Sequence, residues 1–393
     1  MKTEFAERMN GLGTETAFEV LAAARRLEAK GRNIVHLEIG EPDFETPVHI
    51  TEAAIRALHD GYTHYTPAPG LPEARFAVAD YVSRTRGIKA TPEQAILVPG
   101  SKNILLFAAL ALVNPGDEVI FPDPGYPIYE SVARFVGATP RPIRLREEND
   151  FRIDLDEFRA LLSPRTRLVI LNSPHNPCGS ILEREDVEAI AQAVLKTDAY
   201  VLSDEIYSRI QYQGTHYSIL SVPGMQERTI LMDGLSKAYA MTGWRLGFGV
   251  MPPELVEKMS KLMINSSSCA AAFTQMATIA ALTGPQNSVT EMVAEFRARR
   301  GLIVRELNQT HGVSCRMPRG AFYAFANVTA IHEEAKHLST RLLEEGGVAC
   351  LPGTAFGEGG GGFLRFSYAN NQEKILEGMR RLREVVARVE LAV

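Results

Sequence analysis

Short apolar segments alternate with helical segments through the middle of the sequence. Runs that we expect to be strands cover residues 95–98, 118–121, 168–171, 199–202, 229–232 and 246–250. Strands that are apolar throughout are buried on both faces, and their alternation with helices is typical of a parallel sheet that helices cover on both sides. The sequence therefore predicts an α/β protein with a mostly parallel sheet.

The two ends of the chain have a different pattern. Helical spacing covers residues 17–30, with Gly31 as the C-cap, and residues 48–59, and a short extended piece lies between them at 33–39. One long charged helix runs from residue 286 to about 309, and short strands are expected near 322–326, 348–351 and 363–366. The glycine-rich run 358–362 is expected to be a flexible turn between strands.

These patterns predict three parts of the chain. Residues 46–285 form a large domain, and residues 286–393 form a smaller α+β domain. The N-terminal segment, residues 1–45, is expected to join the small domain.

Composition and charge favour a cytoplasmic protein without nucleic-acid or membrane partners. The chain of 393 residues has a net charge of −5, which provides no basic surface for nucleic acid or anionic lipid. Its N-terminus lacks the apolar core of a secretory signal, and the longest apolar run, 104–113, is too short to span a bilayer. The cysteines have neither zinc spacing nor a disulfide framework, which indicates free thiols in a reducing compartment: Cys178, Cys269, Cys315 and Cys350.

The stretch 234–249 carries the strongest chemical signal. Lys237 follows a buried strand, Arg245 lies eight positions later, and glycines and small residues surround both. Two neighbouring cations depress the pKa of the lysine, and the neutral amine is the nucleophile that forms a Schiff base. The arginine has the donors to bind a phosphate. A surface lysine beside a structural arginine is the alternative interpretation of this loop.

Polar residues also follow three other strands, at the edge of the sheet where ligands bind. Ser101 and Lys102 begin a helix whose N-terminus suits a phosphate, although such junctions are common. Asn176 lies in a turn rich in proline and glycine, which is also explained as a rigid loop. Asp204 and Tyr207, three residues apart, share a face if the chain turns helically, and a helix N-cap with a packing tyrosine is the alternative.

The string Ser-Lys-x-x-x-x-x-Gly-x-Arg-x-Gly at 236–247 resembles the pyridoxal-phosphate lysine motif of the class I/II aminotransferases. These enzymes belong to the fold-type-I superfamily that includes aspartate aminotransferase, and the motifs follow in the expected order along nearly the whole chain. The resemblance implies the fold-type-I architecture, in which helices wrap a mostly parallel sheet in the large domain and a smaller α+β domain follows. It also implies pyridoxal 5′-phosphate as cofactor and a homodimer.

The resemblance assigns roles in cofactor binding. Lys237 is expected to hold the cofactor as a Schiff base, and Asp204 is expected to face the ring nitrogen and keep it protonated. Tyr207 and Asn176 lie beside the phenolic oxygen, and Tyr126 stacks on the ring. The phosphate is expected to be bound by Arg245, Ser101, Lys102 and, from the other subunit, Tyr65.

Other roles concern the substrate. Gly40 is expected to pass close to the substrate carboxylate, which Arg365 binds bidentately, with Asn176 nearby. In one departure from the family, Gly234 stands where a Ser or Thr hydroxyl often reaches the phosphate, and Ser236 has no assigned role.

The predicted activity is the exchange of an amino group between an α-amino acid and a 2-oxo acid, with Lys237, Asp204 and Tyr207 as catalytic residues. Glutamate with 2-oxoglutarate is the expected pair, and Lys102 is expected to contact the distal carboxylate. Phe18, Tyr65 and Tyr126 equally suit a pocket for neutral or aromatic side chains.

Two alternatives remain open. A carbon–sulfur lyase that catalyses β-elimination uses the same site. A non-catalytic regulator on this fold usually carries an additional DNA-binding domain, for which residues 1–16 leave no room.

Overall fold

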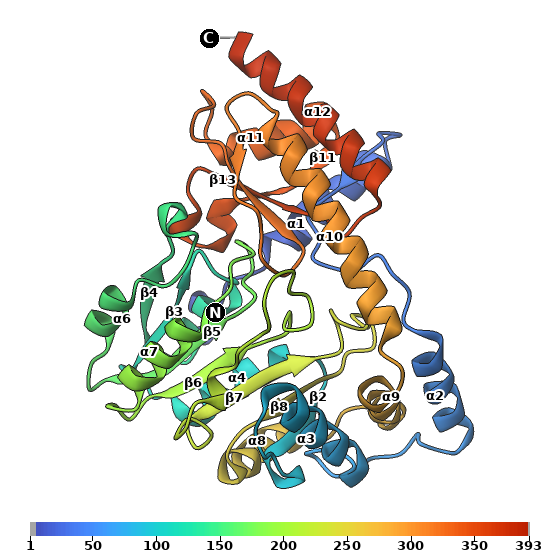
Figure 1. Cartoon of the computed structure of the whole chain (residues 1–393), viewed down its shortest axis with the longest axis vertical. Coiled ribbons are helices and arrows are strands. Elements are labelled where there is room, and N and C mark those ends of the chain that lie inside the picture. Colours follow the sequence, from blue (N-terminus) through green and yellow to red (C-terminus); the bar gives the residue numbers. More distant parts are fainter. Residues whose placement is uncertain (1–4, 392–393) are drawn as a thin grey trace, which may run out of the picture.

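The computed structural model describes residues 5–391, and its larger part is built on one seven-stranded sheet (Figure 1). The order across this sheet is β2-β8-β7-β6-β5-β3-β4, and the neighbours from β7 to β4 run parallel. β8 runs antiparallel to both β2 and β7. The bounds are β2 (Ala95–Val98), β3 (Glu118–Asp123), β4 (Thr139–Arg144), β5 (Thr166–Asn172), β6 (Tyr200–Asp204), β7 (Thr229–Gly234) and β8 (Gly247–Val250).

Helices cover both faces of this sheet, as the apolar strands predict. Alternate residues of β5 belong to different apolar clusters, because successive side chains of a strand point to opposite faces. Leu168 and Ile170 pack in the cluster that includes α4 and α8, whereas Val169 and Leu171 pack in the cluster that includes α7. The helices of this part are α2 (Val48–His59), α3 (Pro72–Arg86), α4 (Lys102–Leu112), α5 (Ile128–Phe135), α6 (Leu155–Leu161), α7 (Arg184–Val194), α8 (Pro253–Ser266) and α9 (Ala272–Thr283), with 3-10 turns η2 (Pro92–Gln94), η3 (Glu147–Asn149) and η4 (Ile219–Ser221).

A smaller α+β part lies above the sheet in Figure 1. Its four-stranded sheet has the order β12-β13-β10-β9, and β1 pairs in parallel with β11. Its strands are β1 (Val35–His36), β9 (Ser314–Cys315), β10 (Tyr323–Asn327), β11 (Val348–Ala349), β12 (Leu351–Pro352) and β13 (Phe363–Ser367). Its helices are α1 (Thr16–Glu28), α10 (Asn287–Asn308), α11 (Ala335–Arg341) and α12 (Gln372–Leu391), with the short helical turns η1 (Glu7–Gly11), η5 (Leu342–Gly346), η6 (Gly353–Phe356) and η7 (Glu358–Gly360).

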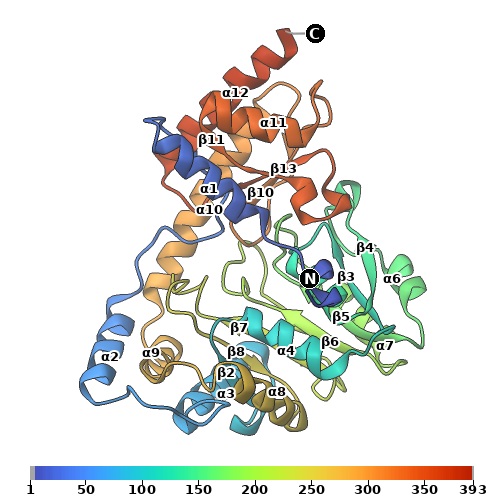
Figure 2. The ribbon, with the colours of Figure 1, turned by 180° about the vertical axis from the view of Figure 1, so that it is seen from behind.

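The N-terminal segment reaches this smaller part from below. Figure 2 shows α1 lying along it, and β1 adds the segment to β11. This arrangement suits the expected association of residues 1–45 with the small domain. The boundaries at 45/46 and 285/286 stay a prediction.

The glycine-rich run 358–362 differs from its prediction as a flexible turn. Its first residues form η7, and the backbone N–H of Gly359 donates to Oδ1 of Asp123 at 2.8 Å. Gly353 and Gly360 lie so close that a Cβ on Gly360 would be 1.9 Å from the carbonyl oxygen of Gly353. The glycines therefore allow close backbone packing.

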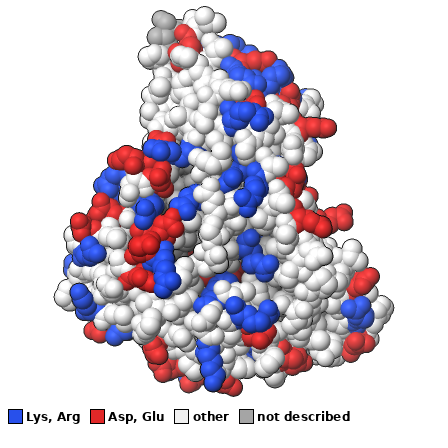
Figure 3. Space-filling model, viewed as in Figure 1, with Lys and Arg blue, Asp and Glu red and all other residues white. Residues whose placement is uncertain are grey.

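Three features of the structure bear on the expectations from composition: the surface charges, the cysteines and the character of the helices. Figure 3 shows acidic and basic side chains interspersed over one face of the molecule. The cysteines are free thiols, as expected, and three of them are buried. Within residues 5–391, every helix is too short or too polar to cross a membrane.

Candidate active site

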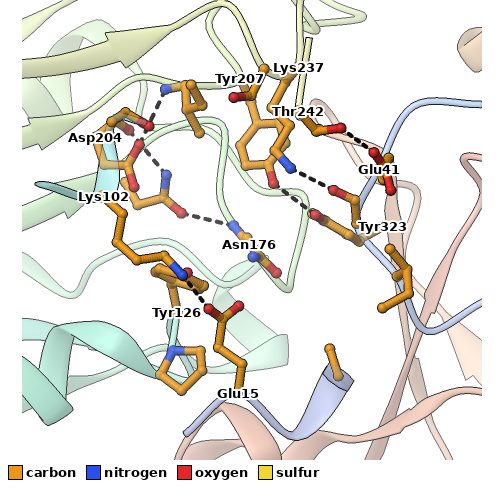
Figure 4. Close-up of a pocket in the computed structure, with 18 of the residues that line it drawn as sticks. Glu15, Glu41, Lys102, Tyr126, Asn176, Asp204, Tyr207, Lys237, Thr242 and Tyr323 are labelled. Carbon is orange, nitrogen blue, oxygen red and sulfur yellow. Dashed lines mark hydrogen bonds and ion pairs between the residues drawn. The ribbon is translucent and has the colours of Figure 1, made fainter. Parts of the chain in front are cut away.

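A cavity of about 520 Å³ lies where the carboxyl edge of the large sheet meets the smaller part of the molecule. Its volume is in the range of small-molecule and cofactor sites. Nearly all the predicted site residues line it, and Figure 4 shows several of them around one space. The predicted residues on its wall are Gly40, Ser101, Lys102, Tyr126, Asn176, Asp204, Tyr207, Lys237, Arg245 and Arg365.

The sheet topology explains how Lys237 and Arg245 meet at this edge. Lys237 follows the carboxyl end of β7, while Arg245 precedes β8. Because β8 is antiparallel to β7, its beginning lies beside the end of β7, and Gly234 pairs with Gly247. The loop between these strands therefore leaves and returns at one point of the cavity wall.

The Lys237 side chain is partly buried in the cavity wall, and its Nζ donates to the carbonyl oxygen of Gly40 at 2.5 Å. Burial lowers the pKa of the amine to about 8, since the charged form loses hydration. Glu41 opposes this change, and Arg365 adds to it. The sequence suggested that Arg245 would depress this pKa; the structure corrects that, because burial comes first and Arg365 is the leading cation.

Arg245 lies over the turn between β2 and α4. A Cβ on Gly100 would be 2.2 Å from Nη2 of Arg245, and a Cβ on Gly247 would be 2.3 Å from the backbone nitrogen of Ser101. Only glycine allows these approaches. Arg245 itself has a φ of 51°, a left-handed conformation that is uncommon for a residue with a Cβ. The result is a guanidinium beside the N-terminus of α4, a combination that binds anions.

Asp204 ends β6 with its side chain buried. Its Oδ2 accepts a hydrogen bond from the Tyr129 hydroxyl at 2.6 Å, and its Oδ1 accepts from the backbone N–H of Ile206 at 3.2 Å. Burial raises the pKa of the carboxyl group to about 7 against the effect of these donors. Sequence reasoning missed Tyr129, although it lies three residues after Tyr126, in the first turn of α5.

A second missed residue, Tyr323, lies between the predicted groups. Its hydroxyl is 2.7 Å from that of Tyr207, and the Arg365 guanidinium lies 4.3 Å from the centre of its ring. A Cβ on Gly40 would be 2.1 Å from the Tyr323 hydroxyl, so Gly40 is required for this approach. Tyr323 thus connects Tyr207 with Arg365 across the cavity wall.

Arg365 is buried on the side of the smaller part. Its Nη1 donates to Oδ1 of Asn176 at 3.1 Å, and its Nη2 donates to the carbonyl oxygen of Glu38. Its Nε is buried without a hydrogen-bond partner among the described residues. A buried guanidinium with an unused donor suits a carboxylate ligand.

Lys102 and Tyr65 differ in their environments. Lys102 is half exposed at the cavity, and its Nζ lies 5.6 Å from the centre of the Tyr126 ring. The same Nζ is paired with the carboxylate of Glu15, a residue that sequence reasoning also missed. Tyr65 is 88% exposed and is absent from the cavity wall that the described residues form. Its contribution to a second subunit stays a prediction.

The donor set fits an anionic aromatic cofactor with an electrophilic carbon. Lys237 offers an amine with a lowered pKa, and Arg245 with the N-terminus of α4 offers an anion site. The close approaches at Gly100 and Gly247 bring these groups together at one end of the cavity. Asp204 offers a buried carboxylate that a cationic ring nitrogen would pair.

Comparisons with known proteins identify the class and then the family. The aspartate aminotransferase of Thermus thermophilus, solved with maleate, superposes with a TM-score of 0.94 at 35% identity, covering 97% of this chain and 99% of that one. The mostly parallel sheet with its smaller α+β part therefore has the fold-type-I architecture of these enzymes. The model of aminotransferase class I and II matches residues 32–382, and this chain belongs to that family.

Curated relatives agree with this assignment. The chain is 40% identical to the aspartate aminotransferase of Pyrococcus abyssi, over 92% of this chain and 93% of the relative. It is 39% identical to the aromatic-amino-acid aminotransferase 2 of Thermococcus litoralis, over 91% and 93%. The protein is an aminotransferase that transfers an amino group between an amino acid and a 2-oxo acid, which confirms the predicted family, fold and activity. These relatives do not favour the β-eliminating lyase.

Proposed function

We propose that this aminotransferase holds pyridoxal 5′-phosphate on Lys237 and exchanges amino groups between glutamate or 2-oxoglutarate and a second amino acid or oxo acid. The observation that carries the proposal is the Lys237 amine, partly buried and with a pKa lowered to about 8, in one cavity with Asp204 and Arg365. When bound, the cofactor supplies an electron-withdrawing ring that stabilises negative charge at the substrate Cα.

The cofactor would be held by groups at both ends of the cavity. Arg245, the Ser101 backbone and the N-terminus of α4 bind the phosphate. Tyr126 stacks on the ring, and Asp204 keeps a proton on the ring nitrogen. Tyr207 and Asn176 bind the phenolic oxygen.

Two residues act on the substrate. Arg365 binds the α-carboxylate through its guanidinium and fixes the direction in which the substrate Cα points. Lys237 Nζ, once free of the cofactor, takes the proton from Cα and later returns a proton. An amine with a pKa near 8 suits both tasks, because each protonation state is accessible near neutral pH.

The substrate class is proposed from Lys102 and from the relatives. The Thermus enzyme was solved with maleate, a dicarboxylate, and another relative is named for aromatic amino acids. Lys102 can pair with a distal carboxylate, and Phe18 and Tyr126 line the same cavity with aromatic surface. We therefore extend the proposal to both dicarboxylic and aromatic substrates.

The proposal also includes a homodimer with shared sites, to which Tyr65 contributes from the other subunit. The exposed Tyr65 supports this, as a phenol that reaches a partner must lie on the surface of the single chain. The division into domains 46–285 and 286–393, with residues 1–45 joined to the latter, is part of the same proposal.

Lys237→Ala tests the covalent anchor. Borohydride reduction of the purified protein followed by peptide mass spectrometry should find the cofactor on Lys237 in the wild type and none in the variant. Lys261→Ala, an exposed lysine on α8, is the matched control and should retain full labelling. Reducible cofactor that persists in Lys237→Ala would reject this anchor.

Activity is tested with a panel of amino donors against 2-oxoglutarate, pyruvate and oxaloacetate. We expect turnover with glutamate as one partner. Pyruvate that accumulates from a β-substituted amino acid without an added oxo acid would instead support β-elimination.

A further inference from the structure

Glu15 occupies the N-cap position of α1 but does not cap that helix. Its side chain makes no capping hydrogen bond with the described backbone of α1. The carboxylate is instead paired with Nζ of Lys102, which lies 87 positions away at the start of α4. An acidic residue at a helix N-terminus usually stabilises that terminus, and this one is directed elsewhere.

The position of Glu15 is fixed from both sides. The backbone N–H of Gly13 donates to Oγ of Ser131 on α5 at 2.9 Å, which attaches the preceding segment to the large part of the molecule. α1 then packs against β11 and β12 in the smaller part. Glu15 therefore lies in a short segment that passes the cavity between these two attachments, with Phe18 close behind it.

Both members of the pair line the cavity. Figure 4 shows the Glu15 carboxylate and the Lys102 ammonium pointing toward each other beside Tyr126. The side chains of Glu15 and Lys102 are 19% and 48% exposed. Exposed ion pairs contribute little to stability, so the pair matters chiefly for the charge that a ligand meets.

This geometry makes Glu15 a competitor for dicarboxylic ligands. A distal carboxylate that approaches Lys102 meets the Glu15 carboxylate, a like charge that already pairs with the ammonium. A neutral or aromatic side chain meets a pair without net charge and needs no exchange of partners. The internal carboxylate therefore acts against one class of substrate and not against the other.

We propose that Glu15 is a specificity-determining residue. Its carboxylate pairs with the Lys102 ammonium and so shifts the preference of the enzyme from dicarboxylic toward neutral and aromatic substrates. The inference rests on the proposed function, since it assumes that both classes enter this cavity. It concerns the ratio between the classes and not the existence of transamination.

Four variants test this role: Glu15→Gln, Lys102→Met, the double variant, and Glu19→Gln as the matched control. Glu19 is an exposed residue in the first turn of α1, and its carboxylate accepts a hydrogen bond from the Thr14 hydroxyl outside the cavity. For each holoenzyme we would measure kcat/KM for glutamate and for phenylalanine with one oxo acid. The dissociation constants of maleate and of 3-phenylpropionate, which do not react, provide a readout independent of turnover.

Glu15→Gln should raise kcat/KM for glutamate about tenfold and lower the dissociation constant of maleate about tenfold. A competing charge is lost in this variant, and the Lys102 ammonium is free to pair with the ligand. Phenylalanine and 3-phenylpropionate should change less than about twofold, and Glu19→Gln should resemble the wild type. The gain should disappear in the double variant, because it requires Lys102.

Other outcomes overturn the proposal. Equal changes for both classes would make Glu15 a general structural residue. Weaker maleate binding in Glu15→Gln would show that Glu15 positions Lys102 for the distal carboxylate. Failure of every variant and of the wild type to transaminate would reject the proposed function, while the maleate titration would still test Glu15.

Discussion

The lowered pKa of the Lys237 amine predicts a specific pH dependence. Because only the neutral amine attacks a carbonyl carbon, the cofactor-free protein should capture pyridoxal phosphate faster as the pH rises through the pKa of Lys237. That pKa is lowered to about 8, so the rate should level off above this value. Stopped-flow absorbance across a pH series measures it.

The control is Lys261→Ala, which should leave the profile in place. A rate that keeps rising to pH 10, where an ordinary lysine titrates, would show that the Lys237 amine is not perturbed in solution.

Variants of Asp204 and Tyr129 should lower the rate of transamination to different degrees. Asp204→Asn removes the negative charge that would hold a proton on the ring nitrogen, and we expect kcat to fall about a thousandfold with folding intact. Tyr129→Phe removes one donor to the carboxylate, which raises the pKa of Asp204 further, and should cost about tenfold. Single-turnover kinetics and circular dichroism would check both, and a near-normal Asp204→Asn enzyme would make Asp204 structural.

Residues inside short local motifs could be predicted from the sequence, whereas their partners could not. Lys237, Arg245 and Asp204 are recognisable because neighbours in the chain carry the pattern. Tyr323 and Glu15 reach the cavity through tertiary packing, from β10 and from the start of α1. Only the fold brings such residues together.

At the scale of elements, a buried ionic cluster joins α3 to the ends of β6 and β7. Arg86 Nε donates to Glu205 and Arg86 Nη2 to Asp233, each at 2.8 Å, and His216 Nε2 lies 2.8 Å from Glu205. Burial raises the pKa of Asp233 to about 6, while His216 and Arg86 hold that of Glu205 well below its usual range. This cluster lies next to Asp204 and fixes the strand that carries it.

Arg86→Met should destabilise the fold by about 3–5 kcal/mol, because two buried carboxylates lose their cation. Arg84→Met, on the same helix, removes an exposed pair with Asp80 and should cost less than about 1 kcal/mol. Urea unfolding at neutral pH compares the two. Equally small losses of unfolding free energy in the two variants would show that water or a local rearrangement compensates for the missing Arg86 charge.

The sequence predicted the elements unevenly. Apolar runs such as 168–171 identified the central strands, since burial on both faces requires them. β4 was missed because it carries Pro140 and Pro142, which only an edge strand tolerates. The direction of β8 was also hidden, because an apolar run has the same appearance in either orientation.

At the scale of the whole molecule, exposed apolar and aromatic side chains bear on the proposed homodimer. α2 exposes Val48, Ile55 and Leu58, and Tyr65 follows that helix. Such clusters on a single chain mark interfaces, and the proposed homodimer would cover them.

Mixing two inactive or weakened variants tests the shared site. Tyr65→Phe and Lys237→Ala chains, refolded together, should form hybrids in which one site keeps both Lys237 and the partner's Tyr65. About a quarter of wild-type activity is expected from an equal mixture if subunits pair at random. Activity no higher than the average of the separate variants would reject sharing, and sedimentation of the mixture confirms that dimers formed.

The pairing of Gly234 with Gly247 has a further consequence for motion and for evolution. The pairing closes the loop 235–246 at its base, so Lys237 and Arg245 belong to one loop that is attached to the large sheet. If the two parts of the molecule shift against each other during turnover, the Lys237 amine and the Arg245 guanidinium should both move with the large sheet. An insertion or deletion within residues 235–246 would change the positions of Lys237 and Arg245 relative to each other. We therefore expect the length of this loop to be constrained in evolution.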